Sequence, residues 1–270
     1  MHRIGLMPPG EEQPHASGSD LSVALIRLNE IALGNRAAYA DIARLITHSA
    51  RNRSTATQRL ELAKSADRAL SARIPATPAE AKLLYERSLR EGKDGDNPDT
   101  IRHFIARAAA MRAGTLKVSP NLGKQLRPTC TLHMLRGMLS SLGIVKTLDS
   151  LAKEGRKLLN DPYVGSATAF DDALQLRLFS HYGTVVQLRE RLFESIVIRR
   201  NNLKIRFEIG DPVYKHSLIL EGFYELDGKI WASLRDSTSY FPTRMSLEDL
   251  GRVLTDDPAL YFSEAWARPR

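Results

Sequence analysis

One cysteine, one histidine and one aspartate stand in this sequence where nucleophilic catalysis could use them. Cys130 is the only cysteine in the chain, and it begins the run CTLHMLRGMLSSLG, whose apolar residues recur at helical spacing. His216 begins HSLILEGF and Asp236 ends KIWASLRD, two runs that read as strands. A cysteine nucleophile needs a base, and the base needs a group that orients it. These three residues therefore form a candidate Cys-His-Asp triad.

The expected helix gives the thiol an activating position. Thr129 is a good N-cap, so Cys130 becomes the first helical residue, and Gly143 ends the helix. The positive end of the helix dipole and the free backbone N–H groups there favour a thiolate. The alternative is that Cys130 packs as a small apolar residue, as many free cysteines do.

The hairpin that carries the other two residues sets a condition on the triad. Asp227 and Gly228 are typical of a two-residue β-hairpin turn. A regular ladder from that turn would set His216 and Asp236 on opposite faces of the sheet. The triad therefore predicts an odd-length loop or a β-bulge between them.

Two stretches of the chain resemble the papain-like cysteine peptidases, especially bacteriocin-processing peptidases and papain-like bacterial effectors. They are GKQLRPTCTLHMLRGMLSSLGI and HSLILEGFYELDGKIWASLRDSTSYFPTRMSLEDL, and Ser246 with Asp249 predicts a short helix within the second. The resemblance implies a nucleophile helix packed on an antiparallel sheet, with Cys130, His216 and Asp236 as catalytic residues. It also implies that Gln125 donates to the oxyanion hole.

This family resemblance leaves the reaction open. The same triad serves a protease, a protein glutamine deamidase or a transglutaminase, because the acyl acceptor and the substrate loops decide between them. A protease acting on a protein substrate ranks first and a deamidase second. Thr131 stands where the family usually has glycine, and Gln125 is one residue closer to the cysteine than the family's glutamine. A non-catalytic helical interaction protein therefore remains the third interpretation.

The order of patterns along the chain predicts an α+β fold. Residues 1–19 have the composition of a disordered leader, and residues 20–113 read as a helical subdomain, with a helix start at Thr77-Pro78. Residues 114–270 form the expected papain-like domain, with helices first and strands from about residue 184 onward.

The composition limits which metals, cofactors and macromolecules we expect the protein to bind. One cysteine allows neither an internal disulfide nor a Cys-rich zinc site, and we expect no metal and no cofactor. The net charge is +8, but the basic residues alternate with acidic ones, which favours a solvated surface over a nucleic-acid interface. We find neither a Sec signal nor an apolar run long enough to span a membrane. These features are consistent with a bacterial effector that is held in the cytoplasm by a secretion chaperone before its export into a host cell. A plain cytoplasmic enzyme would have the same features.

Overall fold

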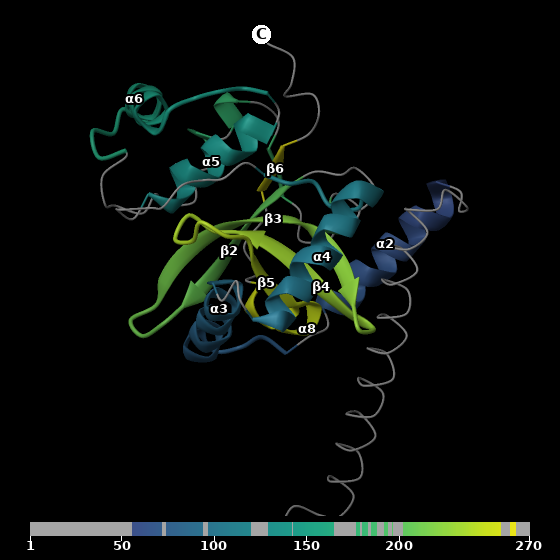
Figure 1. Ribbon diagram of the computed structural model, residues 1–270. Coiled ribbons are helices and arrows are strands. Elements are labelled where there is room, and N and C mark those ends of the chain that lie inside the picture. The colour runs from purple at the N-terminus through teal and green to yellow at the C-terminus, as the bar shows by residue number, and fades with distance from the viewer. Residues whose placement is uncertain are drawn as a thin grey trace, which may run out of the picture. The chain divides into compact units, whose positions relative to one another are not determined.

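The computed structural model describes residues 56–71, 74–93, 97–119, 129–141, 143–164, 177–178, 180–182, 185–187, 192–193, 196, 202–254 and 260–262. Its helices are α2 (Ala56–Ser71), α3 (Pro78–Lys93), α4 (Pro98–Ala113), α5 (Cys130–Ser141), α6 (Leu148–Leu159) and α8 (Leu247–Val253). Its strands are β1 (Val185–Gln187), β2 (Leu203–Ile209), β3 (Tyr214–Leu226), β4 (Lys229–Arg235), β5 (Thr243–Ser246) and β6 (Leu260–Phe262). Figure 1 shows these elements.

The strands form a single antiparallel sheet in the order β1-β6-β2-β3-β4-β5. Strand β3 is the longest, with 13 residues, and it lies in the interior of the sheet between β2 and β4. Helices and an antiparallel sheet in one compact unit make an α+β fold, as the sequence predicted. That unit runs from Ala38 to Arg270.

Alternate residues along β3 enter two different cores. Leu218, Leu220 and Phe223 pack in the core on the side of α3 and α8. Ile219 packs in a second core with the apolar side chains of α5 and α6. Strands alternate their side chains across a sheet, so α5 and α6 cover one face and α3 and α8 cover the other (Figure 1).

Several predicted elements are confirmed at their ends. In α3 the Thr77 hydroxyl accepts from the Glu80 amide at 3.3 Å, and the Glu80 carboxylate accepts from the Thr77 amide at 2.9 Å, which is a capping box. Helix α8 begins at the predicted position, because Ser246 accepts from the Asp249 amide at 3.1 Å. The predicted leader and the helices before residue 50 lie outside the described residues. In the region from about residue 184 where strands were expected, residues 192–193 and Ile196 are helical instead.

A β-bulge interrupts the hairpin between β3 and β4. Next to the Asp227-Gly228 turn, Leu226 pairs with Lys229, but beyond the bulge Ile219 pairs with Arg235, one position out of the earlier register. The irregularity lies between Leu220 and Gly222. It is the feature that the sequence required if His216 and Asp236 were to share a face.

Gly222 makes this bulge possible. Its φ of +149° is a conformation that residues with a Cβ rarely adopt. A Cβ there would also meet the Leu116 Cα and the Thr115 carbonyl oxygen at 3.0 Å, because Leu116 forms an isolated bridge with Gly222. Backbone atoms cannot move aside as a flexible side chain can.

We expect Gly222→Ala to destabilise the protein more than Gly228→Ala. Gly228 also has a positive φ, of +70°, but a Cβ there has no atom within 4 Å. The turn variant should lose about 1–2 kcal/mol of unfolding free energy from backbone strain alone. The bulge variant should lose a further 1–3 kcal/mol or so from the close contact. Urea unfolding of both variants measures the difference, and equal losses would contradict the role given to Leu116 and Thr115.

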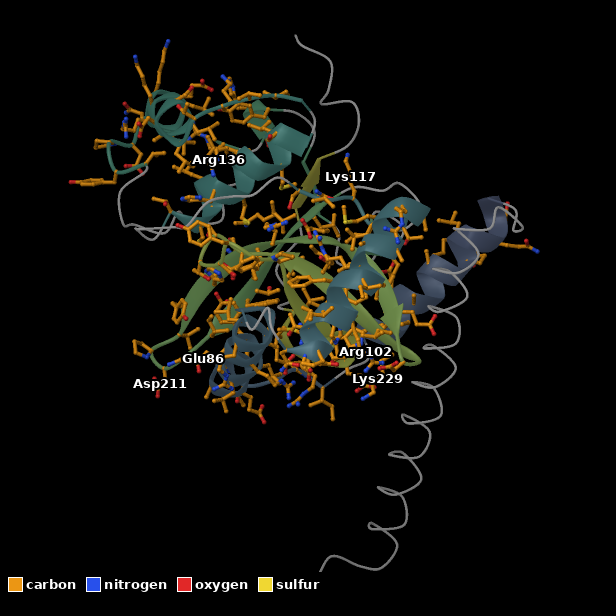
Figure 2. All side chains as sticks on the ribbon, viewed as in Figure 1. Glu86, Arg102, Lys117, Arg136, Asp211 and Lys229 are labelled. Atoms are coloured by element: carbon orange, nitrogen blue, oxygen red, sulfur yellow. The ribbon has the colours of Figure 1, made fainter. Side chains whose placement is uncertain are left out.

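Charged side chains are spread over the molecule. In Figure 2 the labelled cations Lys117 and Arg136 lie toward one end of the view, and Arg102 and Lys229 lie toward the other. In the part of the chain that the structure describes, no helix is both long and apolar enough to cross a membrane.

Candidate active site

Cys130 is the first residue of α5. The Thr129 carbonyl accepts the first helical hydrogen bond from the His133 amide at 3.1 Å, so Thr129 occupies the predicted N-cap position. Cys130 is partly buried, whereas the apolar stripe that follows it, including Leu132 and Leu135, is buried in the core beneath α5. The thiol therefore lies at the edge of the core, at the positive end of the helix.

His216 and Asp236 come together on the face of the sheet that carries Leu218 and Leu234. His216 Nε2 lies 3.0 Å from Asp236 Oδ2. His216 is 6% exposed and Asp236 is fully buried. Because Nε2 faces the carboxylate, the other ring nitrogen, Nδ1, is left for a partner on the opposite side of the ring.

Cys130 bonds with the same ring, because its thiol hydrogen-bonds with the His216 side chain. The structure thus brings all three residues of the candidate triad into one connected chain of hydrogen bonds. Strand β4 ends at Arg235, opposite Ile219, so β3 continues beyond it, and there the Ser217 backbone hydrogen-bonds with the Cys130 sulfur. The start of α5 therefore meets β3 where β4 no longer covers its edge.

The surroundings of Cys130 favour its thiolate. Burial raises the pKa of the thiol, but the hydrogen bond and charge of His216, the backbone hydrogen bond of Ser217 and the charge of Lys204 outweigh it. Together they lower the pKa of Cys130 to about 7. Much of the thiol is therefore ionised near neutral pH, which is the state a cysteine nucleophile needs.

The histidine is held in its charged form. Burial lowers the pKa of His216, but the Asp236 charge and hydrogen bond raise it by more, and Cys130 raises it further. The net pKa lies above the ordinary value of histidine. A raised histidine pKa beside a lowered thiol pKa describes a thiolate–imidazolium pair.

Asp236 is fully bonded although it is buried. Its Oδ1 accepts from the Thr238 amide at 2.7 Å and from the Thr238 hydroxyl at 2.9 Å. Its Oδ2 accepts from His216 and from the Tyr85 hydroxyl, the latter at 2.8 Å. Burial raises the pKa of this carboxyl, but His216 and these donors lower it by more. The carboxylate stays ionised, with a donor for each of its four lone-pair positions.

Tyr85 and Thr238 were not found from the sequence. Thr238 lies in the polar run DSTS after β4, where an Asp followed by a hydroxyl residue two positions on is a weak sign of a turn. Tyr85 lies among leucines in α3, and nothing in its neighbourhood distinguishes it from an ordinary core residue. The predicted oxyanion-hole residue Gln125 lies outside the described residues.

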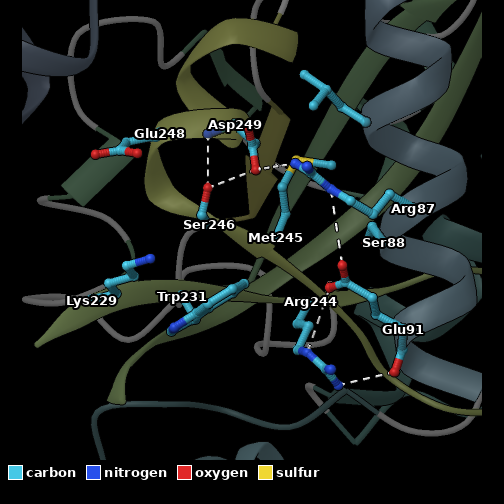
Figure 3. Close-up of a pocket in the computed structure, with 11 residues that line it drawn as sticks. Arg87, Ser88, Glu91, Lys229, Trp231, Arg244, Met245, Ser246, Glu248 and Asp249 are labelled. Atoms are coloured by element: carbon cyan, nitrogen blue, oxygen red, sulfur yellow. Dashed lines mark hydrogen bonds and ion pairs between the residues drawn. The ribbon is translucent and has the colours of Figure 1, made fainter. Parts of the chain in front are cut away.

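A separate pocket of about 300 Å³ lies between α3, β4, β5 and α8 (Figure 3). Four of its charged side chains form pairs: Arg87 donates to Asp249 at 2.6 Å, and Arg244 lies 3.9 Å from Glu91. None of the triad residues lines it. The reactive group is therefore at the start of α5 and away from this pocket.

No protein-family model matches the chain, and no curated protein matches it. The functional argument therefore rests on the geometry of the site.

Proposed function

We propose that this protein is a papain-like cysteine hydrolase that transfers acyl groups, and that it acts on a protein substrate as a protease. The observation that carries the proposal is the connected set Cys130, His216 and Asp236, with the thiol at a helix N-terminus and its pKa lowered to about 7. A cysteine that served only as core packing would need neither an ionised partner nor a carboxylate behind it.

The arrangement supports a two-stage reaction. The Cys130 thiolate attacks the carbonyl carbon, a C–S bond forms, and an electron pair moves onto the carbonyl oxygen. The oxyanion then collapses, the C–N bond breaks, and the His216 imidazolium gives its proton to the leaving amine. In the second stage His216 takes a proton from water, the water oxygen attacks the thioester carbon, and the C–S bond breaks. Asp236 keeps the ring oriented and stabilises its charge throughout.

The same atoms would hydrolyse a glutamine side-chain amide, with ammonia as the leaving group. Deamidation is therefore the second candidate activity, and the substrate decides between them.

We expect Cys130 to react as a low-pKa thiol. Alkylation by iodoacetamide, followed by mass spectrometry of the intact protein, should show a rate that rises through about pH 7, where an ordinary cysteine would rise near pH 8.5. The sign follows from the lowered pKa: above it the thiolate is present, and below it the thiolate is lost. Cys130→Ser is the control and should show no labelling. A rate that rises only above about pH 8 would overturn the proposal.

The reaction type is read from substrate peptides incubated with the wild-type protein and with Cys130→Ala. New peptide ends that depend on Cys130 support proteolysis. Conversion of glutamine to glutamate without chain cleavage supports the deamidase instead.

A further inference from the structure

Tyr85 reaches the candidate triad from a distant part of the chain. Its hydroxyl lies 2.8 Å from Asp236 Oδ2 and 3.1 Å from His216 Nε2. The Tyr85 ring packs edge-on against Phe207, and its centroid lies 5.2 Å from the centroid of the His216 ring. The phenol therefore closes a triangle with the two groups whose mutual orientation the triad requires.

Helix α3, which carries Tyr85, is tied to the rest of the fold on both sides of this residue. The Pro78 carbonyl accepts from the Gly210 amide at 2.9 Å, next to the turn between β2 and β3. Two residues after Tyr85, Arg87 donates to Asp249 of α8 at 2.6 Å. These contacts fix the position of α3, and with it the phenol of Tyr85, relative to the sheet.

The hydroxyl of Tyr85 is a permanent donor. Burial raises the pKa of Tyr85 and the neighbouring Asp236 charge raises it further, so the phenol stays neutral throughout the working range of pH. A buried tyrosine hydroxyl always seeks a partner, and many partners would satisfy it. Here it donates to the same oxygen, Oδ2, that accepts from His216. It therefore takes the second lone pair of that oxygen and opposes rotation of the carboxylate away from His216.

We propose that Tyr85 is a positioning residue of the acyl-transfer site, whose hydroxyl holds Asp236 in the orientation that binds His216. The inference rests on the proposed function, because it assigns Tyr85 a role in keeping the imidazolium beside the Cys130 thiolate. Asp236 is thereby fixed from two directions: Thr238 holds Oδ1 from within the loop, and Tyr85 holds Oδ2 from α3. The helical segment before the nucleophile helix is then part of the site.

The test is Tyr85→Phe in the full chain, which keeps the ring and removes the hydroxyl. Without that donor, Asp236 Oδ2 keeps only its bond from His216, and the carboxylate is oriented less firmly. The imidazolium is then stabilised less, so the thiolate–imidazolium pair becomes less populated. We expect alkylation of Cys130 at about pH 6 to slow by 3- to 10-fold, the size of one buried hydrogen bond, and the rate at about pH 9 to stay near that of the wild type. On a substrate that depends on Cys130, kcat should fall while KM changes little.

Tyr224→Phe is a matched control. Tyr224 is also a buried tyrosine bonded to a buried histidine, His103, at 3.0 Å, but that pair lies outside the triad. Its loss should cost a similar amount of stability and leave the alkylation profile unchanged. If Tyr85→Phe folds poorly, 4-fluorophenylalanine at position 85 fills the volume of the hydroxyl without donating, and it should show the same slowing at low pH.

The outcomes separate this inference from the proposed function. A wild-type thiol that titrates like an ordinary cysteine would overturn both. A wild-type thiol with a low pKa, together with an unchanged profile in Tyr85→Phe or in the fluorinated variant, would overturn the role of Tyr85 and leave the proposed function standing. Equal slowing in Tyr224→Phe would also overturn it, because the effect would then be a general one on stability.

Discussion

Replacing His216 with alanine is expected to lower the turnover of a Cys130-dependent substrate by about 10²- to 10⁴-fold, the usual contribution of general acid–base catalysis. The imidazole bonds with the thiol and carries a charge beside it, and in the proposed reaction it also donates a proton to the leaving group. Tyr85 and Asp236, the two side chains that contact His216 Nε2, do not supply these interactions with the thiol. The loss should appear in kcat more than in KM.

The same substitution should change how Cys130 titrates. His216 favours the thiolate through a hydrogen bond and a charge, so its removal should raise the pKa of the thiol from about 7 toward the ordinary value of about 8.5. Alkylation at pH 7 should slow accordingly, whereas alkylation at high pH should not. Intact-protein mass spectrometry over a pH series gives both quantities.

His181→Ala controls for the loss of a histidine as such, because His181 is exposed and packs edge-on against Tyr182, away from the triad residues. It should leave both activity and alkylation unchanged. If His216→Ala kept the wild-type titration of Cys130, then Lys204 and the helix N-terminus alone would account for the reactive thiol, and the triad interpretation would be wrong.

The second large effect is expected on stability, from Glu221→Gln. Glu221 lies at the β-bulge, its side chain is fully buried, and its carboxylate joins three segments of the fold. Oε2 accepts from Arg107 at 2.7 Å and from Ser233 at 2.8 Å, and Oε1 accepts from the amide and hydroxyl of Ser119 at 2.9 and 2.7 Å. Arg235 approaches Oε1 at 3.4 Å.

A glutamine has nearly the same shape, but it has no charge and offers one acceptor oxygen in place of two. The guanidinium groups of Arg107 and Arg235, which are buried or mostly buried, would then lose the fully buried carboxylate that pairs with both. Removing one partner of a buried ion pair costs about 3–5 kcal/mol, because the remaining charge stays desolvated. We therefore expect Glu221→Gln to lose that much unfolding free energy in urea denaturation.

The loss should depend on pH in a defined direction. Burial raises the pKa of Glu221, but Arg107 and Arg235 lower it by more, so the folded-state pKa lies below the unfolded value. The carboxylate therefore stabilises the fold above the unfolded pKa, and this contribution disappears as the pH falls through the folded pKa. The gap between wild type and variant should accordingly be full at neutral pH and should narrow on acidification.

Asp227→Asn is the matched control for this substitution. Asp227 also accepts from an arginine, Arg102, at 2.5 Å, but both side chains are more than half exposed. An exposed pair contributes about 0–1 kcal/mol, so this variant should be close to wild type. Asparagine also tolerates the positive φ of that turn position. A loss as large as that of Glu221→Gln would show that burial is not what gives the Glu221 network its strength.

Local patterns were sufficient for the elements that carry the site. The N-terminus of α5, the capping box of α3, the Asp227-Gly228 turn and the start of α8 each depend on side chains within a few residues of one another, and such interactions can be read from neighbouring letters. The α+β class follows from the order of these patterns. Even the β-bulge could be stated as a condition, because the two-residue period of a strand makes register a matter of parity.

The sequence by itself therefore determined the helix that begins at Cys130, the hairpin that carries His216 and Asp236, and the requirement that the ladder between them be irregular. Only the tertiary structure decided that Tyr85 of α3 completes the bonds of Asp236 and that Glu221 pairs with two arginines at the bulge. It also decided that the Ser217 backbone bonds with the thiol and that the Lys204 charge lowers its pKa. The physical reason is that these contacts join segments far apart in the chain. A single buried hydroxyl or carboxylate leaves no periodic signal, and its partner is set by how helices pack on the sheet.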